Sequence, residues 1–420
     1  MKNSNAVNRA KLFFYSKSKQ DLDLVRALFT LNLFIFSVLF ESVLGIPKLI
    51  KYLLSVYAIG VIIIYYFRGK VRVREGIFQE LVILLFTIVS IYLLINSVRF
   101  ETFYLQELFA EQFYFLPYLT PVLLLRMSFR LNFYQLLLKW TYRLLPLAII
   151  VQFFVITTAL SVEDYPFNIV GILTVSMSPL LLLGLYSYHQ ARYSLNMLLI
   201  YFLLFAFVTA SMGRRGETLE VLFIFGWAYW IRLRSTSISL NKKQNILALG
   251  FVLLLGGIFF IAETKDDIYL FERGLTQEGF DESRGETVDM FLLDFGSRPS
   301  DWSLGRGLNG KVQKFDRGEE GKSRSIEIGY FNALLKGGLA YLIPMLIILF
   351  SAFYKGYYKS NNDLAKLLSG LALWQIIYMV SFGLPNFNFS YTFLWIGVSS
   401  VLNRDFRALT NEDLTQTIKF

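Results

Sequence analysis

Long apolar runs alternate with short polar segments along most of the chain. A helix needs about 20 predominantly apolar residues to cross the hydrocarbon core of a bilayer, and most of these runs approach that length. We predict twelve spans, at residues 24–44, 49–67, 77–97, 103–125, 133–158, 168–186, 194–211, 217–232, 245–262, 327–353, 364–384 and 387–403. The pattern therefore predicts an all-α polytopic membrane protein in which residues 1–420 form a single transmembrane domain.

One long polar interval breaks the pattern between the ninth and tenth predicted spans. This interval, the large loop (residues 263–326), carries many charges of both signs. The acidic residue Asp294 falls off an apolar stripe within it. That stripe recurs at helical spacing and predicts a short amphipathic helix on the membrane surface or on the spans: Val288, Phe291, Leu292 and Phe295.

A glycine-rich turn follows this predicted helix. Gly305, Gly307 and Gly310 predict a tight turn in which the backbone is exposed and Arg306 is held between glycines. Farther along, the large loop leads directly into the tenth predicted span at Glu327.

The composition supports a membrane protein and excludes several kinds of site. Hydrophobic residues make up 55% of the chain and aromatic residues 17%, with a mean hydropathy of +0.50. A soluble domain of this composition would expose too much apolar surface. The chain has no cysteine and one histidine, His189, so disulfides, thiolate metal sites and histidine clusters are excluded.

Lysines and arginines predict the orientation of the spans. If the N-terminus is cytoplasmic, the loops on its side are rich in Lys and Arg and most of the opposite loops are poor in them, as membrane insertion favours. These loops explain the net charge of +10, which therefore does not indicate nucleic acid binding. The predicted topology places both termini in the cytoplasm and the large loop outside.

A pair of arginines, Arg214 and Arg215, lies in an outer turn where the same rule disfavours positive charge. Gly213 and Gly216 flank them and would let the backbone approach a ligand. The pair is either an anion site built from two guanidinium groups or an interfacial pair that reaches lipid phosphates. The residues alone favour neither interpretation.

Two further charged residues stand at the predicted outer surface. Arg284 lies four residues before Val288 and so near the apolar stripe of the amphipathic helix. Glu327 begins the tenth predicted span, with Tyr330 and Lys336 in the turns that follow. It is either a carboxylate favoured by the helix N-terminus or a general base at the membrane surface.

Taken in order, these features resemble the O-antigen polymerase and O-antigen ligase superfamily of bacterial envelope glycosyltransferases. The resemblance covers the span count, the termini and the position of the large loop, and it implies a GT-C-like membrane fold. Its motifs are the arginine turn at 213–216, Arg284, the Gly-x-Gly turn at 305–307, and residues 327–339. The ligase branch has a histidine where this chain has Glu327, so the chain looks more like the polymerase branch.

The resemblance implies a metal-independent and cofactor-free polymerase that joins undecaprenyl-pyrophosphate-linked repeat units into O-antigen, capsular polysaccharide or exopolysaccharide. It would work at the periplasmic face of the inner membrane. Glu327 would be the general base, and Arg215 and Arg284 would be catalytic. The implied pyrophosphate ligands are Arg214, Arg215, Arg284 and Arg306, and the implied glycan contacts are Trp302, Tyr330 and Lys336.

The implied partners are a lipid-linked glycan donor and acceptor, membrane lipids, a chain-length regulator and a flippase, but no nucleic acid. Three alternatives stay open. An O-antigen ligase would transfer glycan to lipid A core, a flippase or transporter would move lipid-linked glycan with the same arginines, and an assembly protein would need no catalytic residue.

Overall fold

The computed structural model describes residues 13–39, 47–68, 76–97, 108–109, 111, 113–161, 182, 201, 215–235, 284–313, 323–324, 326–380 and 382–417. Within these ranges it describes the backbone alone at residues 36, 38–39, 148, 151–161, 215–218, 284–287, 323–324 and 415–417. Most of the described chain is helical, as the apolar runs predict.

The larger helices of the described chain are α2 (Lys19–Leu39), α4 (Lys48–Arg68), α5 (Ile77–Ser97), α7 (Leu116–Leu124), α8 (Leu131–Ser161), α12 (Arg215–Arg234), α16 (Arg284–Gly296), α18 (Gly329–Tyr358), α19 (Asp363–Tyr378) and α20 (Phe389–Leu402). The shorter elements are α17 (Asp301–Leu304), α21 (Arg404–Ala408), α22 (Asn411–Thr417), and the antiparallel strands β1 (Val312–Gln313) and β2 (Ser323–Arg324).

Three of the described helices are long and apolar enough to cross a membrane: α4, α5 and α18. Helix α5 also exposes large apolar side chains along one side, where Leu81, Leu85 and Ile88 are each 50% exposed or more. An apolar face of this kind suits contact with lipid rather than with water. Helices α8, α12 and α20 also fall on predicted spans, but the total of twelve is not established.

Two predicted spans differ from the structure because of proline and glycine. The continuous helix predicted at 103–125 is wrong, since residues 113–115 form turns and bends and α7 begins only at Leu116. Pro117 lies in the first turn of α7, where a missing amide hydrogen is tolerated. The span predicted at 364–384 ends early, at Tyr378, and the chain then turns through Gly383 at a φ of 63°.

Three other predicted spans, 168–186, 194–211 and 245–262, lie outside the described residues apart from Leu182 and Tyr201. These two residues are buried and belong to a small apolar cluster with α12 and α19. The structure therefore neither confirms nor contradicts these spans.

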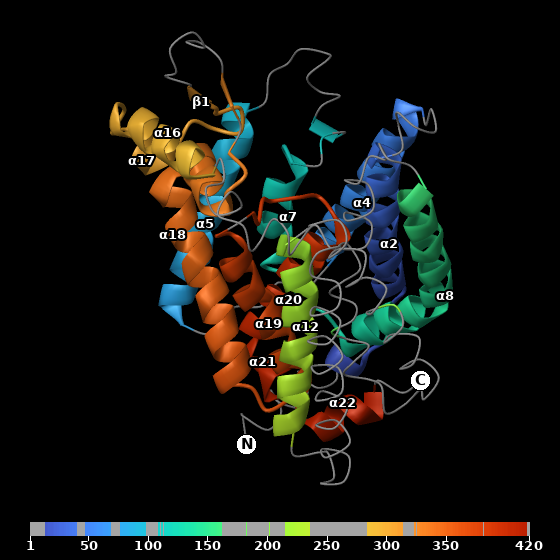
Figure 1. The fold of residues 1–420 in the computed structure, drawn as a ribbon. Coiled ribbons are helices and arrows are strands. Elements are labelled where there is room, and N and C mark those ends of the chain that lie inside the picture. The colour runs from blue at the N-terminus through green and yellow to red at the C-terminus, as the bar shows by residue number, and fades with distance from the viewer. Residues whose placement is uncertain are drawn as a thin grey trace.

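The helices form a bundle with two different ends (Figure 1). Residues 284–313, which comprise α16, α17, the glycine turn and β1, cover the end where α18 begins, and we call them the cap. Helices α21 and α22 lie at the opposite end. Helix α18 runs from the cap end to the opposite end, and α19 returns from there to the start of α18. Which end faces the cytoplasm stays a prediction.

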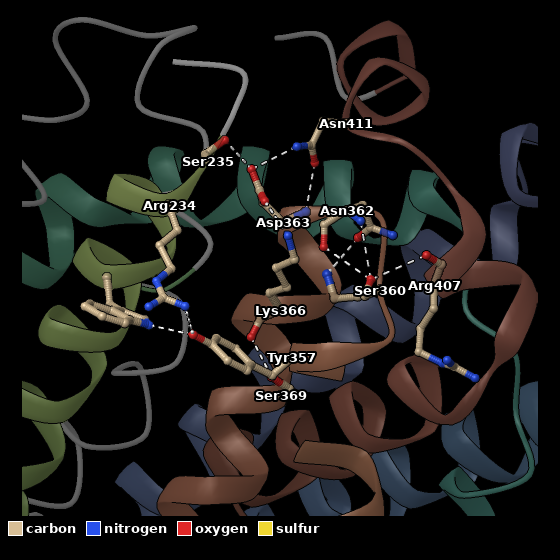
Figure 2. Close-up of polar contacts among 12 residues, drawn as sticks. Arg234, Ser235, Tyr357, Ser360, Asn362, Asp363, Lys366, Ser369, Arg407 and Asn411 are labelled. Carbon is tan, nitrogen blue, oxygen red and sulfur yellow. Dashed lines mark hydrogen bonds and ion pairs between the residues drawn. The ribbon is translucent and has the colours of Figure 1, made fainter. Parts of the chain in front are cut away.

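A polar network at the opposite end holds α12 against α19 (Figure 2). The hydroxyl of Ser235, just after α12, donates to the carboxylate of Asp363 at 2.5 Å, and the amide of Asn411 donates to the same carboxylate at 2.9 Å. The hydroxyl of Tyr357 accepts from Arg234 at 3.2 Å. Because the last residues of α12 are fixed at the opposite end, its first residue, Arg215, lies toward the cap end.

Candidate functional site

The cap sits on a kink in α18 at Gly338. Here the backbone has a φ of 60° and a ψ of −166°, far from helical values. The kink frees two carbonyl groups that the glycine turn uses: the amide of Arg306 donates to Leu335 at 2.7 Å, and that of Gly307 donates to Lys336 at 2.9 Å. Gly305 and Gly307 have φ values of 68° and 75°, so the predicted tight turn is confirmed.

Arg306 ties the cap together through two carboxylates. Its Nη1 is 2.5 Å from the carboxylate of Asp294, and its Nε is 2.6 Å from that of Asp301. Its guanidinium also lies over the ring of Phe295, 4.9 Å from the ring centroid. Most hydrogen-bond donors of Arg306 therefore already have partners within the cap, so its position does not support the predicted role as a pyrophosphate ligand.

Asp294 is fully buried, although the predicted apolar stripe leaves it on the polar side of α16. Burial alone would raise the pKa of Asp294. The hydrogen bonds from Arg306 and from the backbone amide of Gln313 outweigh burial, and they lower the pKa of this carboxyl below its ordinary value. The cap thus contains a buried, ionised pair.

The predicted amphipathic helix is confirmed in α16, with a shifted apolar face. Phe291 and Phe295 are fully buried and stack at 4.1 Å, and Phe291 packs on Phe331 of α18 at 4.8 Å. Leu292, predicted on the buried stripe, is 45% exposed, and Leu293 is 66% exposed. Of the predicted stripe only Leu292 departs, because the buried face of α16 extends instead to Asp294, which pairs with Arg306.

Two of the predicted glycan contacts, Trp302 and Lys336, also stabilise the cap. The Nζ of Lys336 donates to the carbonyl oxygens of Leu308 and Gly310 at 2.5 Å and 2.9 Å, which fixes the glycine turn on α18. Trp302 is half-buried, and its Nε1 donates to the carbonyl oxygen of Phe295 at 3.2 Å. Both side chains have structural partners that account for their positions.

Glu327 and Tyr330 lie where α18 begins. Glu327 is exposed two residues before the helix, and among the described residues it makes no hydrogen bond or ion pair. Tyr330 is half-buried and bound to α19, since its hydroxyl donates to the carbonyl oxygen of Ile376 at 2.7 Å. The close approach of these segments needs Gly329, where an added Cβ would lie 2.3 Å from the carbonyl oxygen of Phe382.

The remaining predicted residues are the arginines of the outer turn and of the large loop. Arg214 lies outside the described residues. Arg215 is the first residue of α12 and Arg284 the first residue of α16, and for both the structure describes only the backbone. The helix starts that carry Arg215 and Arg284 therefore lie toward the same end of the bundle as Glu327.

A cavity of about 120 Å³ opens near this end between α12, α19 and α20. Its aromatic walls include Trp374 and Tyr378 of α19 and Tyr391 of α20. The other lining residues are Phe113, Glu220, Leu371, Gln375, Phe382, Gly383, Leu384, Asn386, Asn388, Ser390 and Leu394. Through Phe382, the cavity wall is continuous with the contact at Gly329 and so with the segment that carries Glu327.

The sequence interpretation missed this cavity. Glu220 is a carboxylate within the apolar run of α12, and it is only 3% exposed. A charged residue inside a predicted span usually faces a cavity or a partner, so Glu220 was a readable signal. Asn386 gave no such signal, because it lies in a loop whose path depends on Gly383 and on the packing of α18.

Among the residues that the structure describes, no group of three or more histidine, aspartate or glutamate side chains is arranged to hold a metal ion. Comparison of the chain with protein-family models, with curated proteins and with solved structures found no match.

Proposed function

We propose that this protein is a membrane glycosyltransferase that polymerises lipid-pyrophosphate-linked oligosaccharide repeat units at the cap end of its helix bundle. The observation that carries the proposal is that three segments far apart in sequence lie toward one end of the bundle. One segment begins with Arg215, the second begins with Arg284, and the third carries Glu327. All three lie toward the end that holds the cap and the cavity. Cations and a carboxylate beside apolar helices suit a lipid-linked anionic substrate.

The proposed reaction is a glycosyl transfer between two glycans. A hydroxyl oxygen of the acceptor forms a bond to the anomeric carbon of the donor sugar, and the bond from that carbon to the phosphate oxygen breaks. The electron pair leaves with undecaprenyl pyrophosphate. Glu327 receives the proton of the attacking hydroxyl, and Arg215 and Arg284 stabilise the negative charge that grows on the leaving group.

In this proposal some cations hold the cap in place and others bind the substrate. Arg306 and Lys336 hold the glycine turn on the kink of α18, so in this proposal they position the cap and do not bind substrate. Arg284 begins the helix that the same cap carries. Arg215, the first residue of α12, and its neighbour in sequence Arg214 are the other cations of the proposed anion site.

The test uses the purified protein in nanodiscs with an undecaprenyl-pyrophosphate-linked repeat unit and no added metal. We expect the wild type to form a ladder of products on a gel. Glu327→Gln should slow elongation by about 10²- to 10⁴-fold, as loss of a general base does. Arg284→Ala should slow it by about 10²- to 10³-fold, as loss of one charge-stabilising donor does.

Matched controls come from the cap itself. Asp289→Asn removes an exposed carboxylate of α16, and Arg298→Ala removes an arginine whose contact with Gln313 is exposed, so both should keep the ladder. A single product formed only with a lipid A core acceptor would indicate a ligase. Movement of labelled lipid-linked glycan across liposomes without elongation would indicate a transporter.

A further inference from the structure

The cavity between α12, α19 and α20 contains buried polar atoms that lack partners. Trp374 is only 8% exposed, and its Nε1 has no hydrogen-bond partner in the described part of the chain. The same holds for Oδ1 of Asn386 on the facing loop and for the hydroxyl of Tyr391 on α20. Leaving a buried donor or acceptor unpaired is costly, so three such atoms on residues that line one cavity indicate that something else pairs with them.

Neighbouring polar groups of the cavity already have structural roles. The amide of Gln375 donates to the carbonyl oxygen of Gly383 at 3.0 Å and holds the loop that carries Asn386. The side chain of Asn388 accepts from the amide of Tyr391 at 2.8 Å and caps α20. Trp374 Nε1, Asn386 Oδ1 and the hydroxyl of Tyr391 are therefore left for an external group. A hydroxyl can donate or accept, so Tyr391 does not restrict the ligand, whereas the other two atoms do.

The chemistry of this pair restricts the ligand. Trp374 needs an acceptor, whereas the oxygen of Asn386 needs a donor. A phosphate or carboxylate cannot donate to Asn386 and would lie near the buried carboxylate of Glu220. An ammonium group cannot accept from Trp374. A hydroxyl group both donates and accepts, so a neutral ligand with several hydroxyls satisfies both atoms.

The walls and size of the cavity restrict the ligand further. Trp374, Tyr378 and Phe382 form a row of rings, with centroids 5.3 Å and 5.9 Å apart. Aromatic rows of this kind suit a ligand with an apolar face and a polar rim. The volume of about 120 Å³ is well below that of clefts for drug-sized molecules, which are about 300–1,000 Å³, so one ring with its hydroxyls is the largest fitting ligand.

We propose that this cavity binds a single neutral sugar ring, with Trp374 Nε1 donating to one hydroxyl and Asn386 Oδ1 accepting from another. The choice of a sugar among hydroxylated rings rests on the proposed function. The cavity would then hold one ring of the glycan, while the arginine-bearing segments bind its pyrophosphate. The contact of Gly329 with Phe382 connects this ring to the segment that carries Glu327.

The test measures binding without turnover. The purified protein in nanodiscs is titrated with a panel of methyl glycosides of common neutral hexoses and 6-deoxyhexoses, and saturation-transfer NMR reports contact with ring protons. We expect at least one glycoside to bind the wild type. Trp374→Phe keeps the ring and removes the donor, and it should weaken binding about three- to tenfold, as should Asn386→Ala.

Trp230→Phe is the matched control. Trp230 does not line the cavity, and its Nε1 donates to the hydroxyl of Tyr357 at 2.8 Å in the network at the opposite end, so this variant should bind as the wild type does. The proposal is overturned if no glycoside binds the wild type, which would mean that the cavity holds only water. It is also overturned if Trp374→Phe binds normally or if Trp230→Phe weakens binding equally.

The binding result and the ladder result separate the two proposals. Specific glycoside binding without any ladder would support the sugar site and contradict the polymerase proposal. A ladder that persists in Trp374→Phe, without any glycoside binding, would support the polymerase proposal and contradict the sugar site.

Discussion

At the scale of single residues, Gly338 decides how the cap meets α18. Its φ of 60° and ψ of −166° form a conformation that is essentially restricted to glycine and costs about 1–3 kcal/mol for a residue with a side chain. A Cβ at this position would also lie 2.4 Å from the backbone of Ser303, so no side chain fits without movement of the cap. The carbonyl groups that receive the glycine turn exist because of this kink.

Gly338→Ala should therefore loosen the cap and leave the rest of the bundle folded. We expect the free energy of cap opening to fall by about 1–3 kcal/mol, so that a protease cleaves the large loop about 5- to 150-fold faster. The control is Gly60→Ala in α4, where an added Cβ would meet no atom within 4 Å. Equal cleavage rates in the two variants would contradict this role of Gly338.

At the scale of elements, α16 is held on α18 by its phenylalanines. Phe295 is fully buried, stacks on Phe291, and lies edge-on to Trp302 at 5.4 Å. The neighbouring leucines point away from this contact. The cap is therefore a small apolar core closed by the ion pair of Arg306 and Asp294, and its docking depends on one face of α16.

Truncating that face should release the helix. Phe295→Ala should cost about 3–5 kcal/mol of cap stability, because it removes a buried ring and leaves a cavity. Leu293→Ala shortens an exposed side chain in the same helix and should cost far less. Hydrogen exchange at the α16 amides measures both changes, and comparable acceleration in the two variants would refute the assigned face.

At the scale of the whole molecule, the network at the opposite end connects parts of the chain that are far apart in sequence. The carboxylate of Asp363 joins the end of α12 to α19 and to the start of α22. A second buried carboxylate, Asp21, accepts from Tyr65 at 3.1 Å, from Arg130 at 3.2 Å and from Asn132 at 3.0 Å. These two residues fix helix positions at one end and so determine where the helix starts lie at the other.

Asp363→Ala should lower the stability of the bundle by about 1–3 kcal/mol, because the hydroxyl of Ser235 and the amide of Asn411 lose the carboxylate to which both donate. The cost should shrink when Ser235→Ala is already present, since adjacent residues of one network are coupled. Thermal unfolding in detergent measures this cycle. Lys366→Ala is the control, because Lys366 is 3.5 Å from Asp363 and partly exposed, so its loss should cost about 1 kcal/mol or less.

The helices could be predicted where the local pattern decides the structure. Helix α5 matches the predicted span at 77–97, and the glycines at 305 and 307 form the predicted turn. The pattern failed at 103–125, where apolar length suggested one helix and the chain turns at residues 113–115. Hydropathy reports which residues avoid water, but it does not report backbone breaks within an apolar run.

The candidate site was only partly predictable. The sequence indicated Arg215, Arg284 and Glu327 as charges at one surface, and the structure brings their segments toward one end of the bundle. Arg306 and Lys336 looked equally suited to a ligand, yet both have partners within the cap. Charge and spacing identify groups able to bind an anion, but they do not show which groups are already paired.

By itself, the sequence determined a helical chain with membrane-length apolar elements, one large polar loop, and a tight glycine turn within it. These features follow from local causes, namely apolar run length and the backbone freedom of glycine. The tertiary structure alone decided that Asp294 is buried beside Arg306 and that Glu220, Trp374 and Asn386 share one cavity. Such partnerships depend on which distant segments pack together, because a hydrogen bond or an ion pair forms between neighbours in space.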